Sequence, residues 1–307
     1  MGGSAIMTFV IAKIIDREAG KITLLADTKL TDRNDDTHNR RTLANPGQKV
    51  VIVDDDVVVG FAGDTPKSAL EKIVELRGQS PEAIEDALLS FTTEMQNLAG
   101  VSKTFLVISK KPTLRITVIG NGNRQDRTGI GTGWVGDAEA FKAFSAIFQS
   151  PAAQAIADLG ARFFMAMVHL IASENVETVG GYLVRVSGSP SQPFRFAPDP
   201  GFVLPTDLDA TLHRQRADEP VNVHLSLPEG ADPTHHVRLP VPGTGPTYSA
   251  LAHYIPEAAT AWLHTHEQPW SVTKLAVQSL SELVDLARAN HHQILDGEIT
   301  QAIMDQL

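Results

Sequence analysis

The sequence contains no cysteine, few tyrosines and tryptophans, and fewer basic than acidic residues. Without cysteine, the chain can form no disulfide, thiolate nucleophile or thiolate-ligated zinc site. The 26 Lys and Arg against 36 Asp and Glu give a net charge of −10, which disfavours binding to nucleic-acid phosphates. Three Trp and three Tyr leave few side chains on which bases could stack. We therefore expect no nucleic-acid partner.

Long apolar runs are also lacking. None reaches the length of a membrane span, and no basic-then-apolar leader opens the chain, so we expect a cytoplasmic protein with no membrane contact. At 307 residues and 42% hydrophobic, the chain can bury a sizeable core. Residues 198–206 are rich in proline, and nine of the 11 histidines follow them. We predict one domain over residues 8–198 and a C-terminal extension over 199–307, an interaction or assembly module.

Strand-like segments occur as hairpins, and pairs of helical segments separate them. Ser80 followed by Pro81 is typical of a helix start. A hairpin with one apolar face must bury that face against another element. Pairs of helices placed between hairpins can cover two stacked sheets in this way. We predict an α+β fold, a four-layer α-β-β-α sandwich, with an additional C-terminal α/β region. Strands are predicted at 8–15, 21–27, 49–53, 57–62, 104–109, 114–120, 180–187 and 194–197, and helices at 65–78, from 80 onward, 137–148 and 151–173.

The C-terminal extension is predicted to contain strands at 221–227 and 236–241 and an amphipathic helix capped by Ser271. Its apolar stripe is Val272, Ala276, Leu280, Leu283, Val284 and Ala287. Upstream, the segment 264–267 (His-Thr-His-Glu) faintly resembles the metal sites of deubiquitinases. However, Ser271 follows too closely and Lys274 stands where an Asp ligand is needed. We expect surface or packing histidines, and no metal or other cofactor.

Residues suited to hydrolytic chemistry stand at the strand ends of the first domain. Thr8 opens the first strand, Asp27 ends the second, and Lys49 begins the third. Gly63 follows Lys49 by 14 positions, in a Phe-Ala-Gly-Asp turn. In this order they resemble the proteasome β-subunit family of N-terminal-nucleophile hydrolases and its bacterial relatives. The resemblance spans roughly residues 8–197, and each fragment alone is a weak signal.

The resemblance implies a role for each residue. Thr8, as first residue of the chain, would be the nucleophile, and its α-amine, with a reference pKa of about 7.7–8.0, would take the hydroxyl proton. Lys49, held by Asp27, would favour the neutral amine and the alkoxide. The Gly63 N–H would stabilise the oxyanion. Thr132, in the Gly-Thr-Gly segment 131–133, would supply the accessory hydroxyl that positions a water.

The resemblance also implies how a substrate would bind. Thr31 and Gly63 would bind the substrate backbone as an added strand. Phe61 falls where the family has the floor of its first specificity pocket, and its ring would favour small or medium side chains. The family assembles into rings or helical arrays, so we expect a homo-oligomer acting on peptides or unfolded proteins. An ATP-dependent unfoldase is a candidate partner.

Two departures from the family keep other functions open. Thr8 follows Met7 instead of the usual Gly, and residues 1–7 must be removed before its amine is free. Val176 to Val179 precede Gly180-Gly181, where the family often has an Asp and a Ser. The leading hypothesis is a threonine peptidase. The alternatives are a catalytically inactive scaffold, sensor or regulatory subunit and, less favoured, an amidase acting on a small molecule.

Overall fold

A computed structural model describes residues 9–29, 46–64, 66–99, 102–173, 176–203, 210–213, 222–225, 236–245 and 248–307. Two predicted site residues, Thr8 and Thr31, lie outside these ranges. The chain divides into two compact units: the first contains residues up to Thr31 and Gln48–Phe196, and the second contains Asp32–Gly47 and Ala197–Leu307. Each unit is described by itself.

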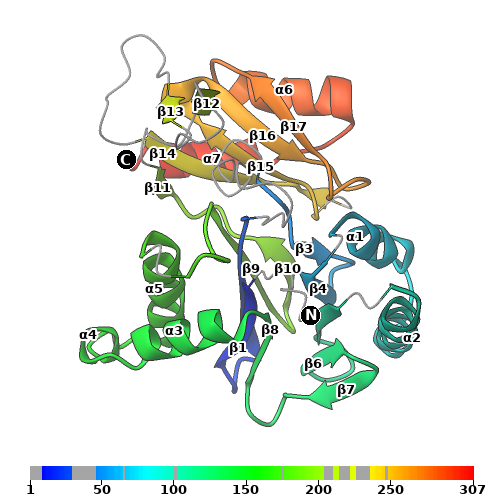
Figure 1. The fold of residues 1–307 in the computed structure, drawn as a ribbon. Coiled ribbons are helices and arrows are strands. Elements are labelled where there is room, and N and C mark those ends of the chain that lie inside the picture. The colour runs from blue at the N-terminus through cyan, green and yellow to red at the C-terminus, as the bar shows by residue number, and fades with distance from the viewer. Residues whose placement is uncertain are drawn as a thin grey trace. The chain divides into compact units, whose positions relative to one another are not determined.

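In the first unit, groups of strands alternate along the chain with groups of helices (Figure 1). The elements are β1 (Phe9–Asp16), β2 (Lys21–Asp27), β3 (Val50–Ile52), β4 (Val57–Gly63), α1 (Pro66–Glu75), α2 (Pro81–Ala99), β5 (Lys103–Ser109), β6 (Arg115–Gly120), β7 (Asn123–Asp126), β8 (Thr132–Gly136), α3 (Ala138–Phe148), α4 (Pro151–Gln154), α5 (Leu159–Ala172), β9 (Leu183–Ser189) and β10 (Gln192–Phe196). The second unit follows with β11 (Gly201–Val203), β12 (Ala210–His213), β13 (Asn222–Leu225), β14 (His236–Pro242), β15 (Leu251–Ile255), η4 (Pro256–Ala258), β16 (Thr260–His264), β17 (Val272–Ala276), α6 (Leu280–His291) and α7 (Gly297–Met304).

One sheet of the first unit has the strand order β10-β9-β2-β1-β8 and is antiparallel throughout. Side chains alternate between the two faces of a strand, so Phe9 and Ile11 share a face of β1. That face packs against α3 and α5, where Phe144 and Phe163 lie edge to face at 5.5 Å between ring centroids. The two helices thereby cover one side of this sheet.

The other sheet has the order β3-β4-β5-β6-β7 and is also antiparallel. Phe91 of α2 packs against Phe105 of β5, with 6.3 Å between ring centroids. The two sheets meet at glycines, since a Cβ on Gly60 would lie 2.6 Å from the Val10 side chain and one on Gly133 would lie 2.9 Å from that of Leu106. Side chains larger than hydrogen would push the sheets apart there.

Most predicted elements of the first unit are confirmed, with two corrections. The glycine-rich segment before α3 is a strand, β8, which pairs with β1. Its Gly133 fits close against Ile116 and Leu106 of the facing sheet, where an extended glycine allows the two backbones to approach. The predicted helix 151–173 is two helices, because Asp158 starts α5 anew as its N-cap, with its side chain accepting from the Ala161 N–H.

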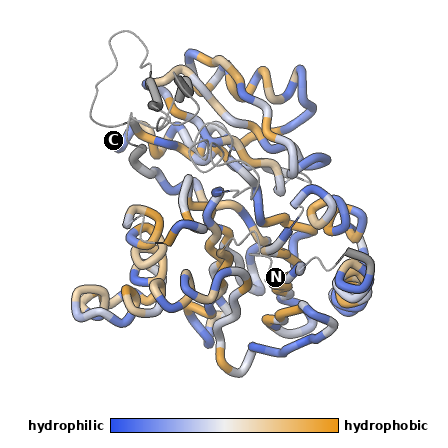
Figure 2. Tube along the Cα trace, viewed as in Figure 1, coloured by the Kyte–Doolittle hydropathy of each residue, from blue (hydrophilic) through white to orange (hydrophobic). Residues whose placement is uncertain are grey.

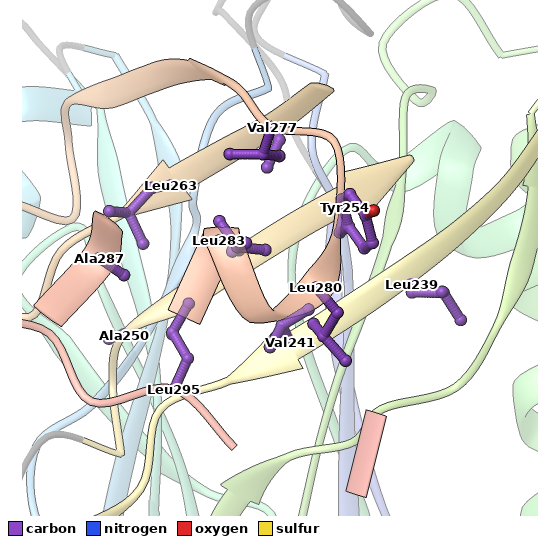
Figure 3. Close-up of a cluster of buried hydrophobic side chains, with 12 residues drawn as sticks. Leu239, Val241, Ala250, Tyr254, Leu263, Val277, Leu280, Leu283, Ala287 and Leu295 are labelled. Atoms are coloured by element: carbon purple, nitrogen blue, oxygen red, sulfur yellow. The ribbon is translucent and has the colours of Figure 1, made fainter. Parts of the chain in front are cut away.

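In the second unit, an antiparallel sheet of order β11-β14-β15-β16-β17 packs one face against α6. Figure 3 shows Leu280 and Leu283 of α6 pointing toward side chains of β14, β15 and β16. The buried cluster consists of Leu239, Val241, Ala250, Ala252, Tyr254, Ala261, Leu263, Val277, Leu280, Leu283, Ala287 and Leu295. This unit therefore has a hydrophobic core of its own.

The predicted helix starting after Ser271 is wrong in its first part. Residues Val272–Ala276 form β17, which pairs with β16, and α6 begins only at Leu280. Ser279 is its N-cap and accepts from the Glu282 N–H. The β-branched Val272 and Thr273 favour the extended backbone, and β16 offers an edge to pair with. Strands β15 and β16 were not predicted.

The helices of both units carry hydrophobic and hydrophilic residues side by side along the trace (Figure 2). This is the pattern of helices with one face on a core and one face in water. None of the described helices is long and apolar enough to cross a membrane.

Candidate active site

The structure brings Asp27 and Lys49 together in a buried ion pair. Asp27 is the last residue of β2, and Lys49 directly precedes β3 in the facing sheet. The Lys49 Nζ lies 2.7 Å from Asp27 Oδ1, and both side chains are 0% exposed. Burial lowers the pKa of Lys49, while the charge and hydrogen bond of Asp27 oppose that change. This pair links the two sheets at one end of the first unit.

Asp27 accepts hydrogen bonds from the backbone as well. The Phe9 N–H donates to Oδ1 at 3.2 Å, beside the Lys49 ammonium. The N–H groups of Lys29 and Gly180 donate to Oδ2 at 3.2 and 3.1 Å. Four donors on one carboxylate offset the cost of burying it. The carboxylate thus holds Lys49 next to the start of β1.

Gly63 is the last residue of β4 and closely follows Phe61, whose backbone is hydrogen-bonded to that of Lys49. The Phe61 N–H donates to the Lys49 carbonyl at 2.8 Å, and Gly63 is two residues further on. Its φ of +132° lies in the region that L-residues rarely adopt. A Cβ at this position would lie 2.4 Å from the Ser102 carbonyl oxygen. Glycine is therefore required here by the backbone, whatever the N–H binds.

Gly63→Ala should lower the free energy of unfolding by roughly 2–4 kcal/mol, because φ strain and a backbone clash act together. Gly78→Ala is the matched control. Gly78 also has a positive φ, of +77°, but a Cβ there would meet nothing within 4 Å. Its cost should be only about 1 kcal/mol. Urea unfolding of both variants measures the difference, and equal costs would mean that the contact with Ser102 does not restrain Gly63.

Phe61 packs on the side of its sheet that α2 covers. Its ring lies 5.6 Å from that of Phe105, and the Lys103 ammonium is 5.8 Å from its centroid. Lys103 donates to the Asp64 carbonyl and to the Ser68 hydroxyl. Burial lowers the pKa of Lys103 to about 8, although the charge of Asp64 opposes this. The predicted pocket floor is thus an aromatic cluster with a buried cation beside it.

Thr132 is not brought to the ion pair. In the register of β1 and β8, Thr132 is opposite Lys13, and Gly136 is opposite Phe9. Four residues of strand, roughly 13 Å, therefore separate Thr132 from the Phe9 end of β1. The Thr132 hydroxyl instead accepts a hydrogen bond from Lys13 Nζ at 3.1 Å.

The residue that follows Gly136 at this end is Asp137, which the sequence analysis did not single out. Its Oδ1 accepts from the Glu139 N–H at 2.8 Å and caps α3, and its Oδ2 accepts from the Thr178 hydroxyl at 2.6 Å. Gly180, two residues beyond Thr178, donates to Asp27. The segment 178–180 therefore connects the Asp137 and Asp27 carboxylates. In the sequence, Asp137 has only the signature of a helix cap.

Two histidines of the second unit, His253 and His264, pack in its sheet. His253 Nδ1 lies 3.2 Å from the Arg238 guanidinium, and the rings of His253 and His264 are 5.9 Å apart. Burial lowers the pKa of His264 to about 4, and burial and the Arg238 charge hold that of His253 well below its usual value. Both imidazoles are therefore neutral near pH 7. In the part of the chain that the structure describes, no three His, Asp or Glu side chains are grouped to hold a metal ion.

Neither a protein-family model nor a curated protein matches this chain. Among solved structures, eukaryotic HslV from Trypanosoma brucei aligns with 59% of this chain and 99% of its own, at 19% sequence identity and a TM-score of 0.43. A similarity at this level carries no conclusion about fold or activity. Function has to be inferred from the contacts of the chain itself.

Proposed function

We propose that the first unit is a proteasome-like threonine peptidase that cleaves peptide bonds with Thr8 as its N-terminal nucleophile. The observation that carries this proposal is the position of the Asp27–Lys49 pair. Its shared oxygen, Asp27 Oδ1, accepts from both Lys49 Nζ and the Phe9 N–H. Phe9 is joined to Thr8 by one peptide bond. A buried ammonium is thereby held next to the residue whose hydroxyl would react.

The packing of the first unit supports the same proposal. α3 and α5 lie on one side of the β1 sheet, α2 packs on the β5 sheet, and the two sheets meet through Gly60 and Gly133. We interpret these contacts as the four-layer α-β-β-α sandwich of N-terminal-nucleophile hydrolases, with the ion pair between its two sheets. The proposed catalytic domain is residues 8–198, and the C-terminal extension is proposed to act in assembly.

The proposed reaction has two steps. The Thr8 hydroxyl oxygen attacks the substrate carbonyl carbon, its proton passes to the Thr8 α-amine, and the Gly63 N–H stabilises the resulting oxyanion. The protonated amine then gives its proton to the leaving nitrogen, and the C–N bond breaks to leave an ester on Thr8. Water, deprotonated by the same amine, hydrolyses the ester and restores the hydroxyl. Lys49 favours the neutral amine by its charge.

Asp137 is proposed as the accessory acid in place of Thr132. Continued by one pair beyond Phe9–Gly136, the register of β1 and β8 would set Thr8 opposite Asp137. A carboxylate there would bind the protonated α-amine and orient it toward the substrate. The Thr178 hydroxyl, which donates to Asp137 Oδ2, would hold the carboxylate in position. Under this proposal, a carboxylate would take the place of the accessory hydroxyl that the resemblance led us to expect.

Asp137→Asn should shift the acidic limb of the pH profile of kcat/KM downward by roughly 1 unit. A neighbouring carboxylate stabilises the protonated amine, so removing its charge lowers the pKa of the amine and makes the neutral base available at lower pH. Lys49 and Asp27, the other charged groups proposed to face the amine, remain in this variant.

Asparagine also caps helices well, so α3 should keep its start. Thr132→Val, the control for the sequence-based assignment, should affect kcat/KM far less than Asp137→Asn. An unshifted limb combined with a lower melting temperature would assign Asp137 to helix capping alone.

Substrate is proposed to bind in extended form along Thr31 and Gly63. Phe61 would form the floor of the first specificity pocket, and its ring, packed against Phe105, would favour small or medium side chains. The partners proposed are peptides or unfolded proteins, further copies of this chain in a ring or helical array, and an ATP-dependent unfoldase.

A catalytically inactive scaffold, sensor or regulatory subunit is the second candidate, because Met7 precedes Thr8 where the family has Gly. Two measurements separate the candidates. Intact-mass analysis tells whether residues 1–7 are removed, and a fluorogenic peptide assay tells whether the resulting chain hydrolyses amides. A chain that starts at Thr8 and turns over peptides supports the peptidase. A chain that starts at Thr8 and hydrolyses none supports the inactive subunit.

A further inference from the structure

Three cations gather at the end of β1 remote from the candidate active site. Lys13 is in β1, Arg17 follows it, and Arg162 is on α5. Lys13 Nζ and Arg162 Cζ lie 5.5 and 5.0 Å from the centroid of the Phe148 ring. Arg17 lies over Gly131, since a Cβ there would be 2.7 Å from its Nη2. The cluster is thus centred on Lys13, whose Nζ donates to the Thr132 hydroxyl at 3.1 Å.

No acid neutralises this cluster. Among the described residues, no carboxylate forms an ion pair with any of the three cations. Asp158, at the start of α5, is occupied as the N-cap of that helix. Burial lowers the pKa of Lys13, and the charges of Arg162 and Arg17 lower it further, with no acid acting against them. In a chain of net charge −10, a half-buried and mutually repelling group of cations is an unusual arrangement.

Several donors of the cluster are available to a ligand. Arg162 Nη1 donates to Gln154 Oε1 at 2.7 Å, and in the described part of the chain no acceptor bonds its Nη2. The Thr132 hydroxyl accepts from Lys13, so its own proton remains free to donate. Gly131, which has no side chain, lets the Arg17 guanidinium lie against the backbone, where its Nη2 donates to the Gly129 carbonyl at 2.9 Å. Guanidinium, ammonium and hydroxyl donors around one space are the groups that bind phosphate oxygens.

We propose that Lys13, Arg17, Arg162 and Thr132 form a binding site for a phosphate-class oxyanion, either the free ion or the phosphate group of a larger molecule. A bound dianion offsets the repulsion among the three cations. The Gly-Thr-Gly segment thereby has a ligand-binding function separate from peptide hydrolysis. The site does not depend on whether Thr8 is catalytic.

Isothermal titration of the full chain with inorganic phosphate tests the site. We expect saturable binding at one site per chain. The melting temperature should also rise by roughly 5 °C when phosphate is at about 100 times its Kd, beyond the effect of sodium chloride at equal ionic strength. Lys13→Met and Arg17→Gln should each weaken binding at least about tenfold. Arg17 is exposed, so its variant tests the site even if Lys13→Met does not fold.

Lys142→Met is the matched control, because Lys142 is 70% exposed and already pairs with Glu139. It should bind phosphate as the wild type does. A phosphate monoester, titrated in parallel, distinguishes the source: tighter binding than inorganic phosphate indicates a phosphorylated ligand, and weaker binding indicates the free ion. Absence of saturable binding, or wild-type affinity in both Lys13→Met and Arg17→Gln, would overturn the proposal.

Discussion

Thr8→Ala, in a chain that begins at residue 8, should lower kcat for peptide hydrolysis by about 10³-fold or more. The proposed mechanism has one nucleophile, the Thr8 hydroxyl, and Thr8→Ala removes the oxygen that forms the acyl ester. Thr8→Ser should retain measurable turnover, because it keeps a hydroxyl next to the same amine. Steady-state hydrolysis of a fluorogenic peptide by the three chains measures the effect. Equal kcat for Thr8→Ala and the wild type would assign the hydrolysis to another residue.

Breaking the Asp27–Lys49 pair should cost about 3–5 kcal/mol of the free energy of unfolding. Lys49→Met leaves a buried carboxylate without its counter-charge, and Asp27→Asn leaves a buried ammonium in the same state. The double variant should be destabilised by less than the sum of the two single variants, because it leaves no uncompensated charge. This result is expected whether or not the chain is an enzyme.

Urea unfolding of the four chains gives the coupling energy directly. Lys142→Met serves as the reference for an exposed pair and should change stability by no more than about 0.5 kcal/mol. Strict additivity of Asp27→Asn and Lys49→Met would show that the 2.7 Å contact is not maintained in solution.

The sequence predicted those site residues whose type by itself restricts the backbone or requires a partner. Asp27 and Lys49 each follow or precede an apolar strand, and the structure joins them as an ion pair. Gly63 was singled out for its N–H, and its φ of +132° gives an independent reason for glycine. These positions could be predicted because charged residues and glycines are rare inside buried strands.

The proposed accessory residue, Asp137, could not be predicted, because its placement depends on strand register. A shift of four positions along β8 separates Thr132 from Gly136, and nothing in the segment 129–136 fixes which residue faces Phe9. Because of the Gly-Thr-Gly motif, the accessory role was assigned to Thr132, whereas Asp137 has the sequence pattern of an ordinary helix cap. The contact with Thr178, 41 positions away, becomes visible only in the folded chain.

The secondary structure of the second unit was harder to predict from the sequence, for a related reason. The apolar stripe from Val272 to Ala287 has helical spacing, yet its first two members, Val272 and Ala276, lie in β17 and its other four lie in α6. The choice of strand over helix depends on the pairing of β17 with β16, which lies close by in the chain but was itself not predicted. The hydrophobic periodicity of one segment carries no information about the strand with which that segment pairs.

The mechanism is tested most directly by comparing two forms of the same chain, one beginning at Thr8 and one beginning at Met1 with residues 1–7 verified as intact by mass. The proposed base is the free α-amine of Thr8, and an amide nitrogen at that position cannot accept a proton near pH 7. Only the form beginning at Thr8 should therefore hydrolyse a fluorogenic peptide. Equal turnover by both forms, or none by the form that begins at Thr8, would show that Thr8 is not the nucleophile of a peptidase.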